Sequence, residues 1–267
     1  HAGEAFGENY ELPNMTAYNE TCAAISMVYL FERMFLLHGE SKYIDCMERT
    51  LYNGVISGMS IDGGRFFYPN PLSSDGKYAF NADGNTTRQP WFGCACCPSN
   101  LCRFIPSVPG YLYGVKDNNI YVNLFAGNTS TIKVNGKDVV LEETTEYPWN
   151  GDIKIAVKKS GVKNANLLVR IPGWVRNQVV PSDLYKYSDA EKPAYTVTIN
   201  GKAVEADLDA NKGYLPVKNI KKGDVIRIHF DMPVRTVVAN GKVADDKGKV
   251  AVERGPLVYC AEAVDNQ

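Results

Sequence analysis

The positions of hydrophobic and polar residues change character near residue 110. Before that point apolar side chains recur at helical spacing, and residues 21–38 (TCAAISMVYLFERMFLLH) form the longest such segment. Gly39 follows this segment and predicts the end of a helix. The segment is apolar on nearly every side, so we expect a buried helix. Its main polar exceptions are Ser26, Glu32 and Arg33.

Shorter elements follow this helix. Ser41 can cap a second helix, whose apolar residues stand at helical spacing, namely Ile44, Met47, Leu51 and Val55. Residues 65–72 (RFFYPNPL) predict a short extended piece that prolines end. Residues 73–90 are rich in Gly, Asn, Asp, Ser and Thr and predict a long surface loop. Residues 98–112 can form one short helix, with Pro98 at the favoured first position.

After residue 110 the pattern is that of β-strands. Short segments rich in β-branched and aromatic residues predict strands, at residues 119–126, 131–141, 152–159, 166–172, 196–204, 224–230, 234–242 and 256–261. Asn-Gly pairs at 135–136, 200–201 and 240–241 accompany these segments, and type I′ hairpins favour that dipeptide. About eight strands at this spacing predict an antiparallel sandwich.

The order of the elements predicts an α + β multidomain chain. Helices come first and strands afterwards, which indicates two units rather than one wound α/β sheet. We place the helical unit at residues 1–110 and a β-sandwich domain at residues 111–267. Two or three helices cannot form a stable layer alone. We therefore expect the helical unit to be part of a larger all-α domain whose first half is absent from this chain.

Composition and charge narrow the choice of partners. The formal net charge is −1 and no long basic block is present, which argues against nucleic acid. We find no apolar run long enough to cross a bilayer and no signal peptide, so we expect no membrane partner. The chain opens with HAGEAFGENYELPN, which reads as the middle of a protein. The compartment, periplasm or cytoplasm of a bacterium, therefore stays open.

Four of the seven cysteines fall within nine residues, at positions 94, 96, 97 and 102. Cys46 and Cys260 are interpreted as small buried hydrophobes in a helix and a strand. That interpretation is less persuasive for the cluster, and a disulfide between adjacent Cys96 and Cys97 would close a strained ring. Zinc, which takes thiolates and carboxylates, is the better interpretation, with the pair held in an irregular loop and Cys94 able to replace either. A sulfur just before a helix N-terminus, especially one bound to zinc, is expected to be ionised and nucleophilic.

Three glutamates stand out beside the cysteines. Glu4 can be an ordinary solvated acid, and Glu20 at the start of the first helix can simply complement the helix dipole. Glu48 interrupts the apolar stripe of the second helix, where a carboxylate needs a partner. It lies either at the rim of a buried face or in a cleft as a functional acid.

Five motifs occur here in the order in which they occur in glycoside hydrolase family 127, the β-L-arabinofuranosidase family, and the related family 146 is similar. They are GEAF (3–6), YELPN (10–14), AYNETCA (17–23), FFYPNPL (66–72) and CCPSN (96–100). The resemblance is firm over residues 1 to about 125 and looser beyond. It implies a partial (α/α)6 barrel, its C-terminal part, followed by β-sandwich modules. The family motif often has proline where Ser99 stands, a change beyond both sulfurs.

The resemblance also implies a site. Zinc (Zn2+) would be held by Glu20, Cys22, Cys96 and Cys97. Cys96 would also be the nucleophile and Glu4 the general acid/base of a retaining glycosidase, with the thiolate in place of the usual second carboxylate. A proton-donating Glu4 needs a raised pKa and hence a partly dry pocket. The positions that line the sugar pocket would be Glu48 and Tyr68.

Three functions follow as alternatives. The first is hydrolysis of β-L-arabinofuranosides, with a plant-type oligo- or polysaccharide that contains L-arabinofuranose as the partner. The family's pocket also uses histidines from the first half of the barrel, and none of the three here (His1, His38, His229) matches them. We therefore expect the enzyme to be incomplete without that N-terminal half. The second alternative is a non-catalytic fragment with structural zinc and a carbohydrate-binding or assembly sandwich, and the third is a thiol redox protein.

Overall fold

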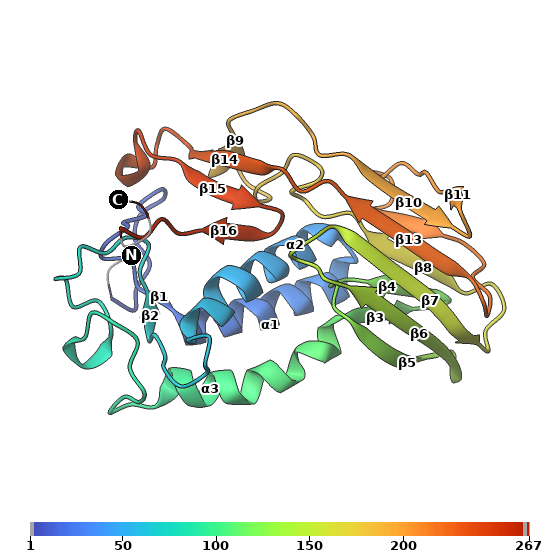
Figure 1. The fold of residues 1–267 in the computed structure, drawn as a ribbon, viewed down its shortest axis with the longest axis horizontal. Helices are drawn as coiled ribbons and strands as arrows, with labels where there is room; N and C mark the ends of the chain where they lie inside the picture. Colours follow the sequence, from blue (N-terminus) through green and yellow to red (C-terminus); the bar gives the residue numbers. More distant parts are fainter. Residues whose placement is uncertain (1–2, 264–265, 267) are drawn as a thin grey trace.

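The computed structural model describes residues 3–263 and 266. Three helices lie side by side in the first half of the chain, α1 (Thr21–His38), α2 (Ser41–Thr50) and α3 (Cys96–Phe104) (Figure 1). α1 ends as predicted, because Gly39 adopts a left-handed conformation (φ 64°) and its N–H bonds to the carbonyl of Phe35. Short irregular helices continue α2 and α3, namely η1 (Leu51–Val55), η2 (Ile56–Gly58) and η4 (Ile105–Tyr111).

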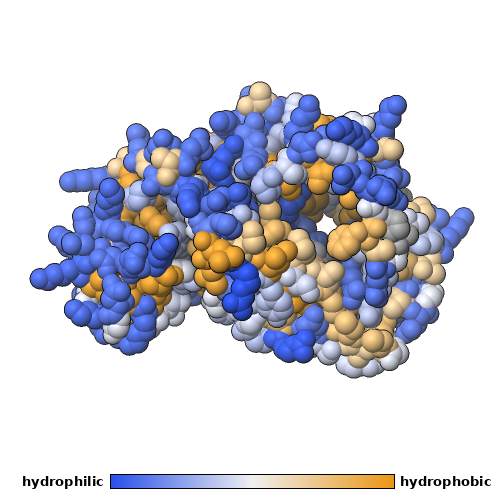
Figure 2. Space-filling model, turned by 180° about the vertical axis from the view of Figure 1, so that it is seen from behind, coloured by the Kyte–Doolittle hydropathy of each residue, from blue (hydrophilic) through white to orange (hydrophobic). Residues whose placement is uncertain are grey.

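α1 is buried on one side only, which differs from the prediction of a helix buried all round. Ile25, Val28 and Phe35 face a core shared with α2 and α3. The rest of its surface exposes apolar residues at Met27, Leu30, Leu36 and Leu37, and in part at Tyr29, whose ring also packs edge-on against Phe104 of α3. Figure 2 shows apolar side chains gathered on the rear face of the molecule, in the region of the helices.

By length and composition α1 could cross a membrane, so the expectation that no run is long enough was wrong. One such helix is weak evidence, because core helices of soluble proteins have the same composition. Here one side packs on two other helices, and insertion would carry Glu32 and Arg33 into hydrocarbon at about 3 kcal/mol for each charge. We therefore interpret α1 as a core helix.

The segment between α2 and α3 has little regular structure, as predicted for residues 73–90. It contains the strand β2 (Pro69–Asn70), the single turn η3 (Ala82–Gly84) and isolated bridges. β2 pairs antiparallel with β1 (Asn19–Glu20), so Glu20 stands opposite Pro69 at the entrance of α1. This pairing fixes the chain just before the first helix.

Two sheets of the second half share one apolar core. Neighbouring strands are antiparallel, except for the parallel pair β4 and β8. The larger sheet has the order β11 (Lys202–Ala203), β10 (Tyr195–Ile199), β13 (Val225–Phe230), β7 (Asp152–Ser160), β6 (Lys137–Thr145), β5 (Asn128–Val134). The smaller has the order β12 (Tyr214–Val217), β8 (Asn166–Arg170), β4 (Asn119–Val122), β3 (Tyr113–Lys116).

A third, antiparallel sheet lies beside the helices at the end of the chain (Figure 1). Its order is β16 (Leu257–Tyr259), β15 (Ala251–Arg254), β14 (Val234–Ala239), β9 (Tyr185–Tyr187), and η5 (Ala244–Asp246) separates β14 from β15. A mixed chain with few helices and several antiparallel sheets is thus confirmed. The helices among the described residues do not close into a barrel, and the partial barrel and the domain limits stay predictions.

Two of the three Asn-Gly pairs form the predicted hairpins. Asn135 and Gly136 join β5 to β6, and both have positive φ, as type I′ turns require. The pair at 200–201 joins β10 to β11 in the same way. The pair at 240–241 does not, because η5 intervenes before the next strand.

Candidate metal centre

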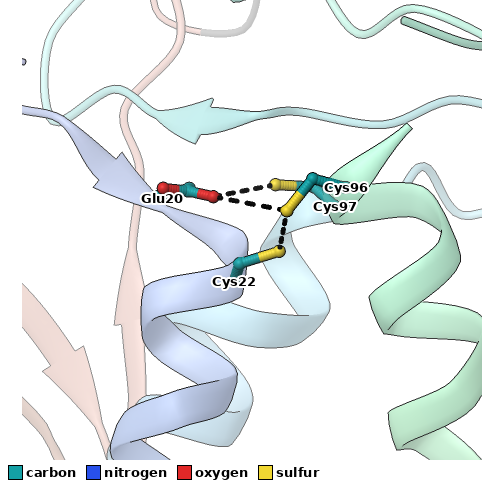
Figure 3. Close-up of side chains that lie close together, drawn as sticks. All are labelled: Glu20, Cys22, Cys96 and Cys97. Atoms are coloured by element: carbon teal, nitrogen blue, oxygen red, sulfur yellow. Dashed lines mark hydrogen bonds between the residues drawn. The ribbon is translucent and has the colours of Figure 1, made fainter. Parts of the chain in front are cut away.

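Four predicted ligands meet where α1 and α3 begin (Figure 3). Glu20 ends β1, Cys22 is the second residue of α1, and Cys96 and Cys97 open α3. Their ligand atoms all lie within 4.8 Å of one another. The structure therefore brings together side chains that are more than 70 residues apart in the sequence.

The distances suit a small four-coordinate cation. Glu20 Oε1 lies 3.8 Å from Cys96 Sγ and 3.6 Å from Cys97 Sγ. Around tetrahedral zinc, with bonds of about 2.0 to 2.3 Å, neighbouring ligand atoms stand roughly 3.5 to 3.8 Å apart. Cys22 Sγ and Cys96 Sγ are closer, at 2.9 Å, so this pair would open slightly around such an ion.

The protonation of the thiols in the cluster depends on whether a cation is bound. Burial raises the pKa of the Cys22 thiol to about 11, and it raises the pKa of the Cys97 thiol further. We expected a sulfur at the start of α3 to be ionised, but burial of the Cys97 thiol favours its protonated form while no cation is bound. A divalent ion would reverse the preference, because it attracts thiolates directly.

The adjacent cysteines lie in a helix and not in the irregular loop that we expected. α3 begins at Cys96, two residues before Pro98, and both sulfurs reach the space at its N-terminal end. Cys94 is exposed and does not belong to the four-residue group. It has the spacing of a redox Cys-x-x-Cys pair with Cys97, but both are free thiols, and Cys97 is buried against Glu20.

Glu4 lies outside this group, in a segment of bends. Its side chain is exposed, so the expected partly dry pocket is not formed by the described residues around it. Its Oε1 accepts a hydrogen bond from the Tyr18 hydroxyl at 3.3 Å. Burial, then the carboxylates of Glu20 and Glu4, raise the pKa of the Tyr18 hydroxyl. The sequence analysis missed Tyr18, although positions two apart in extended chain share a face.

Tyr68 borders the cluster through its backbone and its ring. Its carbonyl oxygen lies 3.8 Å from Cys97 Sγ and accepts a hydrogen bond from the Thr21 N–H at 3.0 Å. The half-buried ring packs edge-on against Phe92, and burial and the Cys96 thiol raise the pKa of its hydroxyl. Tyr68 therefore lies beside the cluster.

Glu48 is not brought to the cluster. Its side chain is 2% exposed and faces the sandwich. The Arg170 guanidinium donates to both of its oxygens, and the Tyr147 hydroxyl donates to Oε1 at 3.0 Å. In place of the predicted sugar contact, the structure gives Glu48 a buried ion pair between α2 and β8. Of the histidines, His38 ends α1, His229 lies in β13, and His1 is outside the described residues.

Comparison with known families gives three matches in order along the chain. Residues 1–110 match the catalytic domain of β-L-arabinofuranosidases of glycoside hydrolase family 127. Residues 119–232 match the middle domain of the same family, and residues 234–267 match its C-terminal domain.

Similar proteins are longer than this chain. A non-reducing end β-L-arabinofuranosidase of Bifidobacterium longum subsp. longum is 37% identical over all of the chain, which spans 39% of that protein. A solved β-arabinofuranosidase of family 127 is 59% identical with a TM-score of 0.92, over 99% of this chain and 40% of that one. A β-L-arabinofuranosidase of the family from Geobacillus stearothermophilus T6 is 40% identical with a TM-score of 0.85, at the same coverage.

Proposed function

Because the chain belongs to glycoside hydrolase family 127, we propose that it carries the catalytic centre of a retaining β-L-arabinofuranosidase. The observation that carries this proposal is the convergence of three thiols and one carboxylate within 4.8 Å at the start of two helices. The substrate would be a plant-type oligo- or polysaccharide with terminal L-arabinofuranose.

The four side chains of the cluster would hold Zn2+. A bound zinc ion would supply positive charge that keeps a cysteine sulfur ionised at neutral pH. Cys96 is the better nucleophile of the two adjacent cysteines, because it is half-buried while Cys97 is fully buried. Tyr68 would contact the sugar beside it, whereas Glu48 supports the fold.

The reaction would proceed in two displacements. The Cys96 thiolate forms a bond to the anomeric carbon while the bond to the leaving oxygen breaks and Glu4 gives that oxygen its proton. Glu4 then takes a proton from water, whose oxygen bonds to the anomeric carbon as the bond to Cys96 breaks. Retention follows because each displacement inverts the carbon once.

We further propose that residues 1–110 complete a barrel only together with helices outside this chain. The chain spans about 40% of its relatives' length. The exposed apolar side of α1 supports this arrangement, since it offers the kind of surface on which a neighbouring helix packs. Those helices would also enclose Glu4 and supply the pocket histidines. Residues 111–267 would form the β-sandwich part.

Activity on an aryl β-L-arabinofuranoside tests the proposal in the full-length protein that contains this chain. Cys96→Ser should abolish turnover, whereas Cys102→Ser, an exposed thiol of the same helix outside the cluster, should leave it unchanged. Metal analysis should give about one zinc per chain, lost in part or whole with Cys97→Ser.

The alternative is a structural zinc site beside a carbohydrate-binding or assembly sandwich. It predicts bound zinc in a wild-type protein that hydrolyses no furanoside. Zinc-loaded full-length protein without activity on any β-L-arabinofuranoside would therefore refute the enzymatic proposal and favour this alternative.

A further inference from the structure

We propose that Tyr18 is the positioning residue that holds the Glu4 carboxylate for its acid–base role, an inference that rests on the function proposed above. The sequence gives Tyr18 no such role, and the structure places its hydroxyl 3.3 Å from Glu4 Oε1.

Glu4 needs a positioning partner because its own segment gives it little support. Residues 3–5 are bends, outside any helix or strand, and Gly3 has a positive φ of 70°. Within residues 3–263 and 266, the Tyr18 hydroxyl makes the one side-chain hydrogen bond to the Glu4 carboxylate. A general acid must lie within hydrogen-bond reach of the leaving oxygen, and a displacement of about 1 Å can cost about 100-fold in rate.

Tyr18 is itself well anchored. It directly precedes β1, whose residue Asn19 pairs with Asn70 of β2, and it follows the buried Ala17. Three residues further, at the start of α1, the Thr21 hydroxyl donates to the carbonyl of Phe67 at 3.1 Å. The same strand carries Glu20 into the metal cluster. Tyr18 therefore connects the Glu4 carboxylate to the strand that also carries the metal ligand Glu20. This connection would hold the acid at a constant position relative to the nucleophile.

Tyr18→Phe in the full-length, zinc-loaded protein removes the donor and keeps the ring. Tyr10→Phe is the matched control, because Tyr10 belongs to the same N-terminal segment but donates to Asp183 at 2.8 Å. For substrates with poor leaving groups, which need the proton, Tyr18→Phe should lower kcat/KM roughly 10- to 100-fold. For a dinitrophenyl leaving group, which does not, the change should stay below about 2-fold. Tyr10→Phe should alter neither.

A double-mutant cycle separates positioning from general support of the fold. If Tyr18 acts through Glu4, Tyr18→Phe should cause no further loss in a Glu4→Gln background. Equal losses for good and poor leaving groups, additive losses in the cycle, or a lower zinc content of Tyr18→Phe would each overturn the inference while wild-type activity stands. A wild-type protein without furanosidase activity would instead refute the proposed function itself.

Discussion

Glu143 of β6 is a buried carboxylate whose replacement should change the pH dependence of stability. Its side chain is 3% exposed and accepts hydrogen bonds from the Tyr113 hydroxyl and the Ala126 N–H, both at 3.1 Å. No cation pairs with it among the described residues. Burial raises its pKa to about 8, although the hydrogen bonds from Tyr113 and Ala126 oppose the shift.

The direction and size of the effect follow from proton linkage. Between the ordinary pKa of 4.5 and the folded value of about 8, the folded protein keeps the proton of Glu143 while the unfolded chain loses it. The folded state binds more protons, so stability falls as pH rises through this window. From pH 5 to pH 8 the loss assigned to this carboxylate is about 3 kcal/mol.

Urea unfolding at pH 5 and at pH 8 measures this loss in wild type and in Glu143→Gln. The amide cannot ionise, so the variant should lose about 3 kcal/mol less than wild type over that interval. Glu142→Gln is the control, because Glu142 directly precedes Glu143 in β6 but forms an ion pair with Lys158 at the surface. If Glu143→Gln and wild type lose stability equally between the two pH values, the carboxylate does not titrate in this window and the argument fails.

Three further predictions concern the buried ion pair of Arg170 and Glu48, the close approach of Gly151 to Phe230, and the four-residue cluster. Arg170→Met leaves Glu48 buried without its partner and should cost about 3 to 5 kcal/mol in urea unfolding, whereas Arg227→Met, at an exposed position of β13, should cost less than about 0.5. Gly151→Ala would place its Cβ 1.9 Å from the Phe230 carbonyl oxygen and should lower stability by about 1 to 3 kcal/mol, while Gly241→Ala, in open space, should not. Thiol titration of the zinc-loaded protein should show three more reactive cysteines after a chelator is added, and an unchanged count would argue against a metal in the cluster.

Local patterns predicted the elements that are long or that carry a specific turn signal. The apolar run and Gly39 predicted the limits of α1, and Asn135 and Gly136 predicted a hairpin. The strands β3, β9, β12 and β15, each of three or four residues, were missed, and β12 contains Pro216. The parallel pairing of β4 with β8 has no local signal, since it depends on three strands that lie between them in the chain.

Contacts between distant segments could not be read from the residues alone. The cysteine pair at 96–97 suggested a metal, but its distance from Cys22 left the other ligands open until the family motifs were considered. Glu48 was rightly expected to need a partner, yet that partner, Arg170, is 122 residues away. The burial of α1 was overestimated because composition reports how apolar a helix is, and not which of its sides another element covers.

The contacts between the helices and the strand-rich half also determine where this chain can be divided into separate fragments. Leu112, Leu124 and Tyr214 come from the strand-rich half, yet they complete the apolar core of α1, α2 and α3. Separation of the chain near residue 110 would expose that core to water. It would also leave the Arg170 guanidinium without its partners, the carboxylates of Asp45 and Glu48. The two halves therefore share an apolar core and buried ion pairs across residue 110. A chimaera that exchanges the sandwich would need to bring a matching surface for α2 with it.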